Sequence, residues 1–358
     1  MKRVGFLTSG GDCQGLNAAL RGVAKTLYNE FGDKLTLYGI RDGYRGLIEG
    51  DYHEMKESDF SDILTVGGTI LGTSRQPFKS MLKAEENEET KLEKMLKTIK
   101  EAKFDCLVIL GGNGTHKTAN LLSEHGVHVV TLPKTIDNDL WGTEMTFGFQ
   151  SAVDIATTVI DSIHSTAFSH SRVFIVEVMG HKAGWLTLYA GIASGADVII
   201  IPEIPYSAKA IAKAIQKREK SGKRFSILAV AEGAISQEEA KMSKKEFKAA
   251  REAMPYPSIS YRIAEELKEL TGQEIRVTIP GHYQRGGAPC PADRLLTSRL
   301  GVAAAQLIRD GKFGNMVAVQ DDKIVPVPLS EVAGKLKTVP PDSDIVQAAR
   351  DLGLSMGD

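Results

Sequence analysis

Short runs of β-branched and other apolar residues recur along the chain, and several of them run directly into a loop rich in glycine. The first four runs are residues 3–8, 35–40, 106–110 and 127–132. A segment that is apolar throughout is typical of a strand covered on both faces, as in a parallel sheet whose strands alternate with helices. The sequence therefore predicts an α/β fold.

The same alternation continues to the end of the chain, with helices expected at residues 147–164 and 292–310. Because 358 residues exceed the usual size of one domain, we expect two doubly wound lobes. The expected limits are a first lobe at 1–140, a second at 141–310, and a segment at 311–358 that returns to the first. Five further strands complete the prediction: 172–178, 198–201, 225–231, 276–279 and 316–319.

The composition argues against several classes of protein. The 44 Lys and Arg residues balance 45 Asp and Glu, which leaves no overall charge to attract nucleic acid or an anionic membrane. The three cysteines are widely separated and odd in number, which argues against a disulfide framework or a zinc cluster. The apolar runs are shorter than the about 20 residues of a membrane helix. A cytoplasmic protein is expected.

Three loops in the first third of the chain contain paired glycines: residues 8–12, 66–69 and 110–115. Glycine lets the backbone approach an anion, and a helix that begins just afterwards presents free N–H groups to it. One such loop is weak evidence, since tight turns use glycine without binding anything. Three together predict a polyphosphate site, although the P-loop and dinucleotide fingerprints are absent. Arg75 follows the second loop and either reaches a phosphate or is a solvated surface residue.

A loop with two carboxylates follows the strand at 127–132. Asp137 and Asp139 are two residues apart, and Thr135 offers a hydroxyl close by. One carboxylate can accept the proton of an attacking hydroxyl while the other holds Mg²⁺ or orients the first, so the pair suits phosphoryl transfer. The alternative is a turn that caps the next helix.

A basic loop at residues 281–287 follows the strand that contains Arg276. His282 and Arg285 in this loop indicate a site for a sugar phosphate, and Glu232, after another strand, can accept hydrogen bonds from sugar hydroxyls. Arg276 could instead be an ordinary salt-bridge partner, and His282 a structural histidine.

Taken together, these segments resemble 6-phosphofructokinase. The resemblance rests on Gly10-Gly11-Asp12 with Gly15 and Asn17 and on four further segments, in the same order up to about residue 320: residues 111–115, 133–139, 176–180 and 281–287. It implies an active site in the cleft between two lobes. It also implies the glycolytic transfer of the γ-phosphoryl of ATP to the 1-hydroxyl of fructose 6-phosphate, with Mg²⁺.

The resemblance assigns roles residue by residue. Asp137 is the general base, supported by Thr135 and Asp139, with Arg172 as a further catalytic residue. Donor-binding positions are Gly11, Arg75, Gln76, Gly112, Asn113, Gly114 and Thr115. Sugar-phosphate positions are Thr135, Asp137, Arg172, Met179, Gly180, His181, Glu232, Arg276, His282 and Arg285. Since Arg172 and Arg276 match residues that reach a neighbouring subunit's site, a homo-oligomer, dimer or tetramer, is implied.

Two residues depart from the familiar bacterial pattern. Asn113 stands where that pattern has a metal-binding Asp, so Asp137, Asp139 or the nucleotide phosphates would carry Mg²⁺. His181 replaces an arginine, which weakens an anion contact or makes it pH-dependent.

Two positions favour different phosphoryl donors. Gly114 matches the ATP-using enzymes, because the pyrophosphate-using relatives have Asp there and a carboxylate would repel the α-phosphate of a nucleotide. Lys134 resembles the pyrophosphate-using enzymes. We expect ATP, and pyrophosphate is the alternative.

Two other classes compete with this interpretation. NAD kinases and lipid kinases contain a similar glycine loop, but they lack the 133–139 loop joined to the 281–287 loop. A non-catalytic nucleotide-binding regulatory subunit is suggested by Asn113, and formation of fructose 1,6-bisphosphate by the chain would exclude it.

Overall fold

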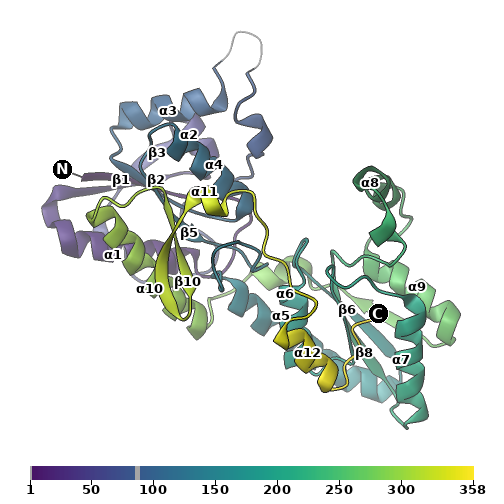
Figure 1. Cartoon of the computed structure of the whole chain (residues 1–358). Coiled ribbons are helices and arrows are strands. Elements are labelled where there is room, and N and C mark those ends of the chain that lie inside the picture. Colours follow the sequence, from purple (N-terminus) through teal and green to yellow (C-terminus); the bar gives the residue numbers. More distant parts are fainter. Residues whose placement is uncertain (1, 85–88) are drawn as a thin grey trace. The chain divides into compact units, whose positions relative to one another are not determined.

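The computed structural model describes residues 2–84 and 89–358, which form two compact units, each built on one β-sheet (Figure 1). The first unit contains Met1–Ser151 and Arg285–Lys337, and the second contains Ala152–Gln284 and Thr338–Asp358. The α/β fold expected from the sequence is confirmed. The chain passes between the units inside helix α5 (Phe149–His170) and again after residues 284 and 337.

These divisions differ from the expected limits at 140 and 310. Residues 285–310 belong to the first unit because helix α10 (Pro291–Arg309) packs on helix α1 (Leu16–Phe31). The late chain contributes two strands to the first sheet, of which only the one at 316–319 was expected, and it belongs to the first unit only as far as residue 337. Residues 338–358 lie in the second unit, where Ser355 pairs with the edge of the sheet: the N–H of Ile199 donates to its carbonyl over 2.8 Å.

The sheet of the first unit has seven strands in the order β11-β10-β5-β4-β1-β2-β3. The five inner strands are parallel and match the predicted segments: β1 (Lys2–Thr8), β2 (Leu35–Ile40), β4 (Cys106–Gly111), β5 (Val129–Pro133) and β10 (Asn315–Gln320). The edge strands β3 (Tyr52–Met55) and β11 (Lys323–Pro328) are antiparallel and were not expected. β3 is short and β11 contains two prolines, which a sheet tolerates at its edge.

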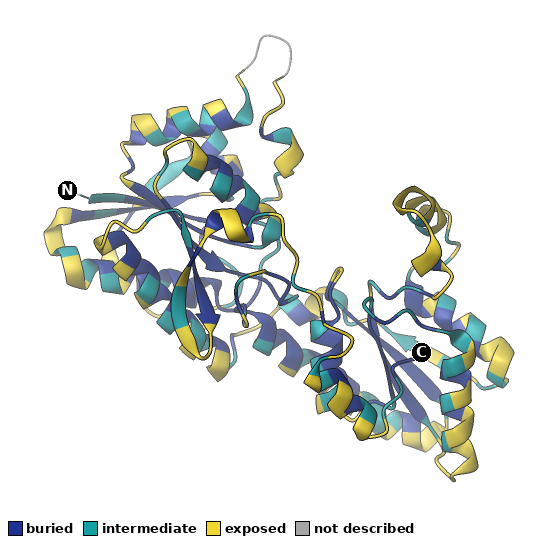
Figure 2. Cartoon of the chain, in the orientation of Figure 1, coloured by how far each residue is buried: buried dark blue, intermediate teal, exposed yellow. Residues whose placement is uncertain are grey.

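Helices cover both faces of this sheet. Helices α1 and α10 lie on one face. The other face carries four helices: α2 (Tyr44–Glu49), α3 (Lys91–Ala102), α4 (Asn113–Glu124) and α11 (Leu329–Val332). The strands between the two layers are largely buried (Figure 2), which explains why they are apolar throughout.

The sheet of the second unit has four parallel strands in the order β7-β8-β6-β9. These strands are β6 (Val173–Val178), β7 (Val198–Ile200), β8 (Ser226–Ala231) and β9 (Ile275–Thr278). Helices α7 (Ala208–Lys220) and α9 (Ile259–Thr271) pack on one face around an aliphatic core, and α6 (Trp185–Ala193) contacts β7 and β8. The unit also contains helices α8 (Lys244–Glu252) and α12 (Asp344–Asp351) and the larger part of α5.

Among the described residues, five short 3₁₀ helices connect these elements: Gly32–Lys34, Glu57–Phe60, Phe78–Ser80, Glu239–Lys241 and Gly281–Arg285. Among the helices of the described chain, none is both long and apolar enough to span a membrane.

Helices α1 and α10 touch backbone to backbone where two glycines face each other. A Cβ placed on Gly301 would lie 2.8 Å from the Cα of Gly22 and 2.8 Å from the backbone N of Val23. Real Cβ atoms essentially never come so close to another atom. The close crossing therefore requires glycine at position 301, whereas a Cβ on Gly22 would be a tight contact at 3.3 Å from the Cα of Gly301.

We predict that Gly301→Ala destabilises the chain. Alanine favours a helix by about 1 kcal/mol over glycine, but its methyl group would meet rigid backbone, and overpacking of this kind costs about 1–3 kcal/mol. The melting temperature should fall by about 1–4 °C, whereas Val302→Ala at the neighbouring exposed position should leave it nearly unchanged. An unchanged melting temperature for Gly301→Ala would contradict the tight crossing.

Candidate active site

Three loops of the first unit lie side by side because they follow three adjacent parallel strands. β1 pairs with β4 and β4 with β5, so their carboxyl ends lie at the same end of the sheet. The loops are tied together there: the N–H of Ser9 donates to Leu110 O over 2.9 Å, and that of Lys134 to Gly111 O over 3.0 Å. The sequence predicted that the glycine and carboxylate loops belong to strand ends, and the sheet order brings them together.

The loop after β4 leads directly into helix α4, which begins at Asn113. Gly112 occupies the N-cap and has no side chain with which to cap the first N–H groups. Gly114 is exposed, and a Cβ placed there would find no described atom within 4 Å. The start of α4 therefore has open space and a positive dipole end, as an anion site requires.

Two cationic side chains lie against the loop after β1. The ammonium group of Lys134 donates to Gly11 O, and a Cβ on Gly10 would lie 3.6 Å from Lys134 Nζ. The guanidinium of Arg285 occupies the space that a Cβ on Gly11 would need. Lys134 is buried, and burial lowers its pKa. Arg285, which was expected near the sugar phosphate, thus lies in the first unit beside the glycine loop.

The segment that carries Arg75 and Gln76 packs on the same glycine loop. Thr73 Oγ1 donates to Gly10 O over 2.7 Å, and the N–H of Gly10 donates to Ser74 O over 3.1 Å. The Arg75 side chain is exposed, whereas the Gln76 side chain accepts a hydrogen bond from Lys91 Nζ over 2.7 Å. Arg75 is therefore the more accessible of the two.

The second glycine loop, at 66–69, has a structural explanation. A Cβ on Gly67 would overlap the carbonyl of Gly287. Asn17 donates to Val66 O over 3.0 Å and accepts from the N–H of Ile70 over 2.8 Å. Close packing of backbone against backbone is enough to require glycine at position 67.

The carboxylate loop after β5 is held in a defined conformation. The N–H of Asp137 donates to Thr135 Oγ1 over 3.0 Å, and Thr146 Oγ1 donates to Thr135 O over 2.8 Å. Asn138 has a φ of 50°, a left-handed conformation that Asn tolerates. Asp137 is partly buried, whereas Asp139 is buried and burial raises its pKa. Asp137 is therefore the carboxylate that a reactant can reach more easily.

Sequence reasoning missed Lys337, which contacts this loop from a distant part of the chain. Lys337 Nζ donates to Asn138 Oδ1 over 3.0 Å, and the N–H of Lys337 donates to Asp139 O over 2.8 Å. Burial lowers the pKa of Lys337 to about 8, and the nearby Asp139 and Glu144 oppose that shift. Nothing in the local sequence around residue 337 indicates this role.

In the second unit, the loops after β6, β8 and β9 meet in the same way. Glu232 Oε1 accepts hydrogen bonds from the N–H groups of His181, over 2.8 Å, and Gly180, over 3.3 Å. Gln284 is buried and its Oε1 accepts from the N–H of Met179 over 3.3 Å. The structure thus gathers Met179, Gly180, His181 and Glu232, with Gln284 as a supporting residue that the sequence did not reveal. His282 is exposed in the adjoining turn.

Arg172 and Arg276 lie at the opposite end of the second sheet. Arg172 precedes β6, and Arg276 pairs in register with Phe174 near the start of that strand. The six residues of β6 separate them from Met179 by about 20 Å. Both arginines form ion pairs with Glu274, that of Arg172 Nε at 2.6 Å. The structure therefore brings the two arginines together, but not with the other substrate-site candidates of this unit.

The candidate metal ligands are few. Within residues 2–84 and 89–358, no three His, Cys, Asp or Glu side chains cluster as a metal site. The amide of Asn113 donates to Lys335 O, so only its carbonyl oxygen is suited to a cation. Asp137 and Asp139 supply carboxylates, but Mg²⁺ at this place would need further oxygen ligands from phosphates and water.

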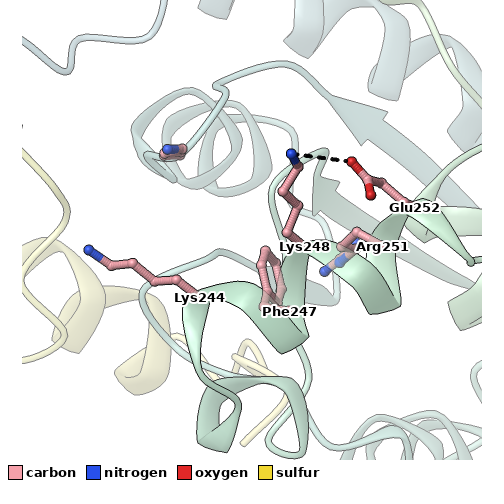
Figure 3. Close-up of a pocket in the computed structure, with 6 residues that line it drawn as sticks. Lys244, Phe247, Lys248, Arg251 and Glu252 are labelled. Carbon is pink, nitrogen blue, oxygen red and sulfur yellow. Dashed lines mark ion pairs between the residues drawn. The ribbon is translucent and has the colours of Figure 1, made fainter.

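A surface pocket of about 500 Å³ lies on helix α8 of the second unit (Figure 3). Its basic side chains are partly neutralised: Arg251 pairs with Glu239 at 2.9 Å, and Lys248 with Glu252 at 3.5 Å. None of the predicted site residues lines this pocket, whose lining residues are Lys182, Lys244, Phe247, Lys248, Arg251 and Glu252.

The two sheets and their loops define a doubly wound α/β protein of the class that binds phosphorylated ligands at the carboxyl ends of its strands. A family model described as phosphofructokinase matches residues 3–308. The chain belongs to the phosphofructokinase family.

Individual relatives agree with this assignment over the full length. An ATP-dependent 6-phosphofructokinase of Spirochaeta thermophila is 56% identical over 99% of this chain and 97% of its own length. ATP-dependent 6-phosphofructokinase 3 of Bacteroides thetaiotaomicron is 47% identical over 99% of this chain and 100% of its own length. The crystal structure of Pichia pastoris phosphofructokinase in the T-state superimposes with a TM-score of 0.80 at 32% identity. It covers 98% of this chain, which spans 36% of that longer chain.

Proposed function

We propose that the chain is an ATP-dependent 6-phosphofructokinase that acts in the cytoplasm. It transfers the γ-phosphoryl of ATP to the 1-hydroxyl of fructose 6-phosphate and forms fructose 1,6-bisphosphate, a step of glycolysis. The observation that carries the proposal is the shared strand end of the first unit, where the open N-terminus of α4 adjoins the Asp137 loop. The names of the full-length relatives support the same reaction.

The first unit is proposed to bind the phosphoryl donor. The N–H groups at the start of α4 would face the phosphates, and Gly11 and Gly112 would let the backbone approach them. Lys134 and Arg285 would offset negative charge on the transferred group. Arg75 is exposed and long enough to contact the donor as well.

Asp137 is proposed as the general base. Its loop is braced through Thr135, so the carboxylate can accept the proton of the 1-hydroxyl as that oxygen attacks the γ-phosphorus in line. Asp137 and Asp139, with the phosphate oxygens, would hold Mg²⁺. When bound, the ion neutralises charge on the phosphates. Asp139 is buried and also braces the loop.

The second unit is proposed to bind the sugar phosphate. Glu232 holds the loop of Met179–His181 through Oε1, and its other oxygen, Oε2, would accept a hydrogen bond from a sugar hydroxyl. His181 and His282 are exposed imidazoles that suit contact with the 6-phosphate.

Arg172 and Arg276 are proposed to serve the sugar site of a neighbouring subunit in a homo-oligomer. Their separation from Met179 and Glu232 by the length of β6 supports a role outside their own unit's site. Glu274 would keep both guanidinium groups oriented.

Pyrophosphate is the second candidate donor, because buried Lys134 lies against the glycine loop that would hold the transferred phosphate.

The proposed function predicts formation of fructose 1,6-bisphosphate from fructose 6-phosphate, Mg²⁺ and ATP, with pyrophosphate much less effective at equal concentration. A coupled aldolase assay would measure both rates. If the chain formed product with pyrophosphate but not with ATP, pyrophosphate would be the donor. If it formed no product with either donor, the result would support a non-catalytic regulatory subunit.

We predict that Asp137→Ser lowers kcat by about two to four orders of magnitude, because the serine cannot take the proton in the transition state. The KM values for both substrates should change little. Steady-state kinetics would measure this, with the exposed Asp161→Ser on α5 as a control for loss of one surface acid. Near-normal turnover by Asp137→Ser would exclude Asp137 as the base.

We predict that Gly114→Asp lowers kcat/KM for ATP at least about tenfold, since a carboxylate there would repel the nucleotide phosphates. Stability should not fall, because the position is exposed and an acid in the first turn of a helix stabilises it by about 0.3–1 kcal/mol. The Gly114→Asn variant is the control, because the asparagine side chain has nearly the size of aspartate but no charge. It separates the effect of charge repulsion from that of steric crowding. Undiminished use of ATP by Gly114→Asp would contradict the placement of the nucleotide at α4.

A further inference from the structure

The ammonium group of Lys337 is saturated by oxygen atoms of the segment that follows Asp137. Its Nζ donates to Asn138 Oδ1 over 3.0 Å, to Thr143 O over 2.8 Å and to Glu144 O over 2.9 Å. A lysine ammonium has three N–H donors. Each therefore has an acceptor, and the orientation of the group is defined.

The backbone around Lys337 is fixed to the same segment. The N–H of Lys337 donates to Asp139 O over 2.8 Å, and Leu336 forms an antiparallel bridge with Leu140. Strand-like pairing thus brings the lysine to the segment, and its side chain then spans the turn between Asn138 and Glu144.

Asn138 links this contact to the loop that carries Asp137. Asn138 Oδ1, the atom that Lys337 contacts, also accepts from the N–H of Thr146 over 3.0 Å. Thr146 Oγ1 donates to Thr135 O over 2.8 Å, and Thr135 Oγ1 accepts from the N–H of Asp137. Hydrogen bonds of Asn138, Thr146 and Thr135 therefore connect the ammonium group, through these three residues, to the backbone of Asp137.

We propose that Lys337 is a positioning residue for phosphoryl transfer, which holds the 138–144 segment so that Asp137 keeps the orientation of a general base. The inference rests on the proposed function. Lys337 itself touches none of the reacting atoms in this role. Correct placement of a catalytic group is worth a large factor in rate, and small displacements reduce turnover strongly.

The first experiment compares Lys337→Met with the wild-type chain and with Lys323→Met, the same change at an exposed position on β11. We expect kcat of Lys337→Met to fall about 10- to 100-fold while the KM values for ATP and fructose 6-phosphate stay within about threefold. Lys323→Met should match the wild type. A folded Lys337→Met with normal kcat, or with raised KM values and normal kcat, would overturn the inference.

The second experiment is a double-mutant cycle with Asp137→Asn. If Lys337 acts through Asp137, then adding Lys337→Met to the Asp137→Asn variant should lower kcat little further, because the general base is already absent. The same fold-loss in both backgrounds would show that Lys337 acts independently of Asp137 and would refute the proposal. Residual rates can be measured at high enzyme concentration.

Folding is monitored by melting temperature and circular dichroism. If Lys337→Met does not fold, Lys337→Arg keeps a cation but changes its geometry, and it should show lower kcat at a near-native melting temperature. If neither variant folds, the lysine serves folding and the inference fails. A wild-type chain that forms no fructose 1,6-bisphosphate overturns the proposed function, whereas an active wild type with fully active Lys337 variants overturns this inference alone.

Discussion

Parallel pairing of β1, β4 and β5 is the constraint on which the proposed donor site depends. The register places Thr8 beside Leu110 and Gly111 beside Pro133, so three strands end in one row and three loops begin there. A shift in register would move the strand ends out of this row and break the backbone hydrogen bonds between the loops. The core and the site are thus stabilised by the same contacts.

In the first unit, the ammonium group of Lys134 lies against the backbone of the glycine loop after β1. Lys134 is buried and donates to the carbonyl of Gly11, and burial lowers its pKa. Burial makes the charged form of an ammonium group less favourable, and an incoming anion offsets that cost. In the second unit the arrangement differs, since Arg172 and Arg276 share the carboxylate of Glu274. Glu274 thus holds both arginines in place within their own unit.

The sequence predicted the buried strands well because their apolar character is continuous over several neighbouring residues. It did not predict β3 and β11, which are edge strands of mixed character. The divisions between the units also differed from expectation. Residues 285–310 contain α10 and belong to the first unit, because Gly301 of α10 packs on Gly22 of α1. A glycine in a helix does not reveal which other helix it faces.

The glycine loops, the Asp137–Asp139 pair and the basic 281–287 loop were determined by the sequence itself, since each is a pattern within a few neighbouring residues. The tertiary structure decided which of these patterns meet. It placed Arg285 against Gly11, explained Gly67 by the approach of Gly287, and separated Arg172 and Arg276 from Glu232. It also brought Lys337 to Asn138 across 199 residues of chain. Contacts of that range depend on how whole strands and helices pack, and no local pattern encodes them.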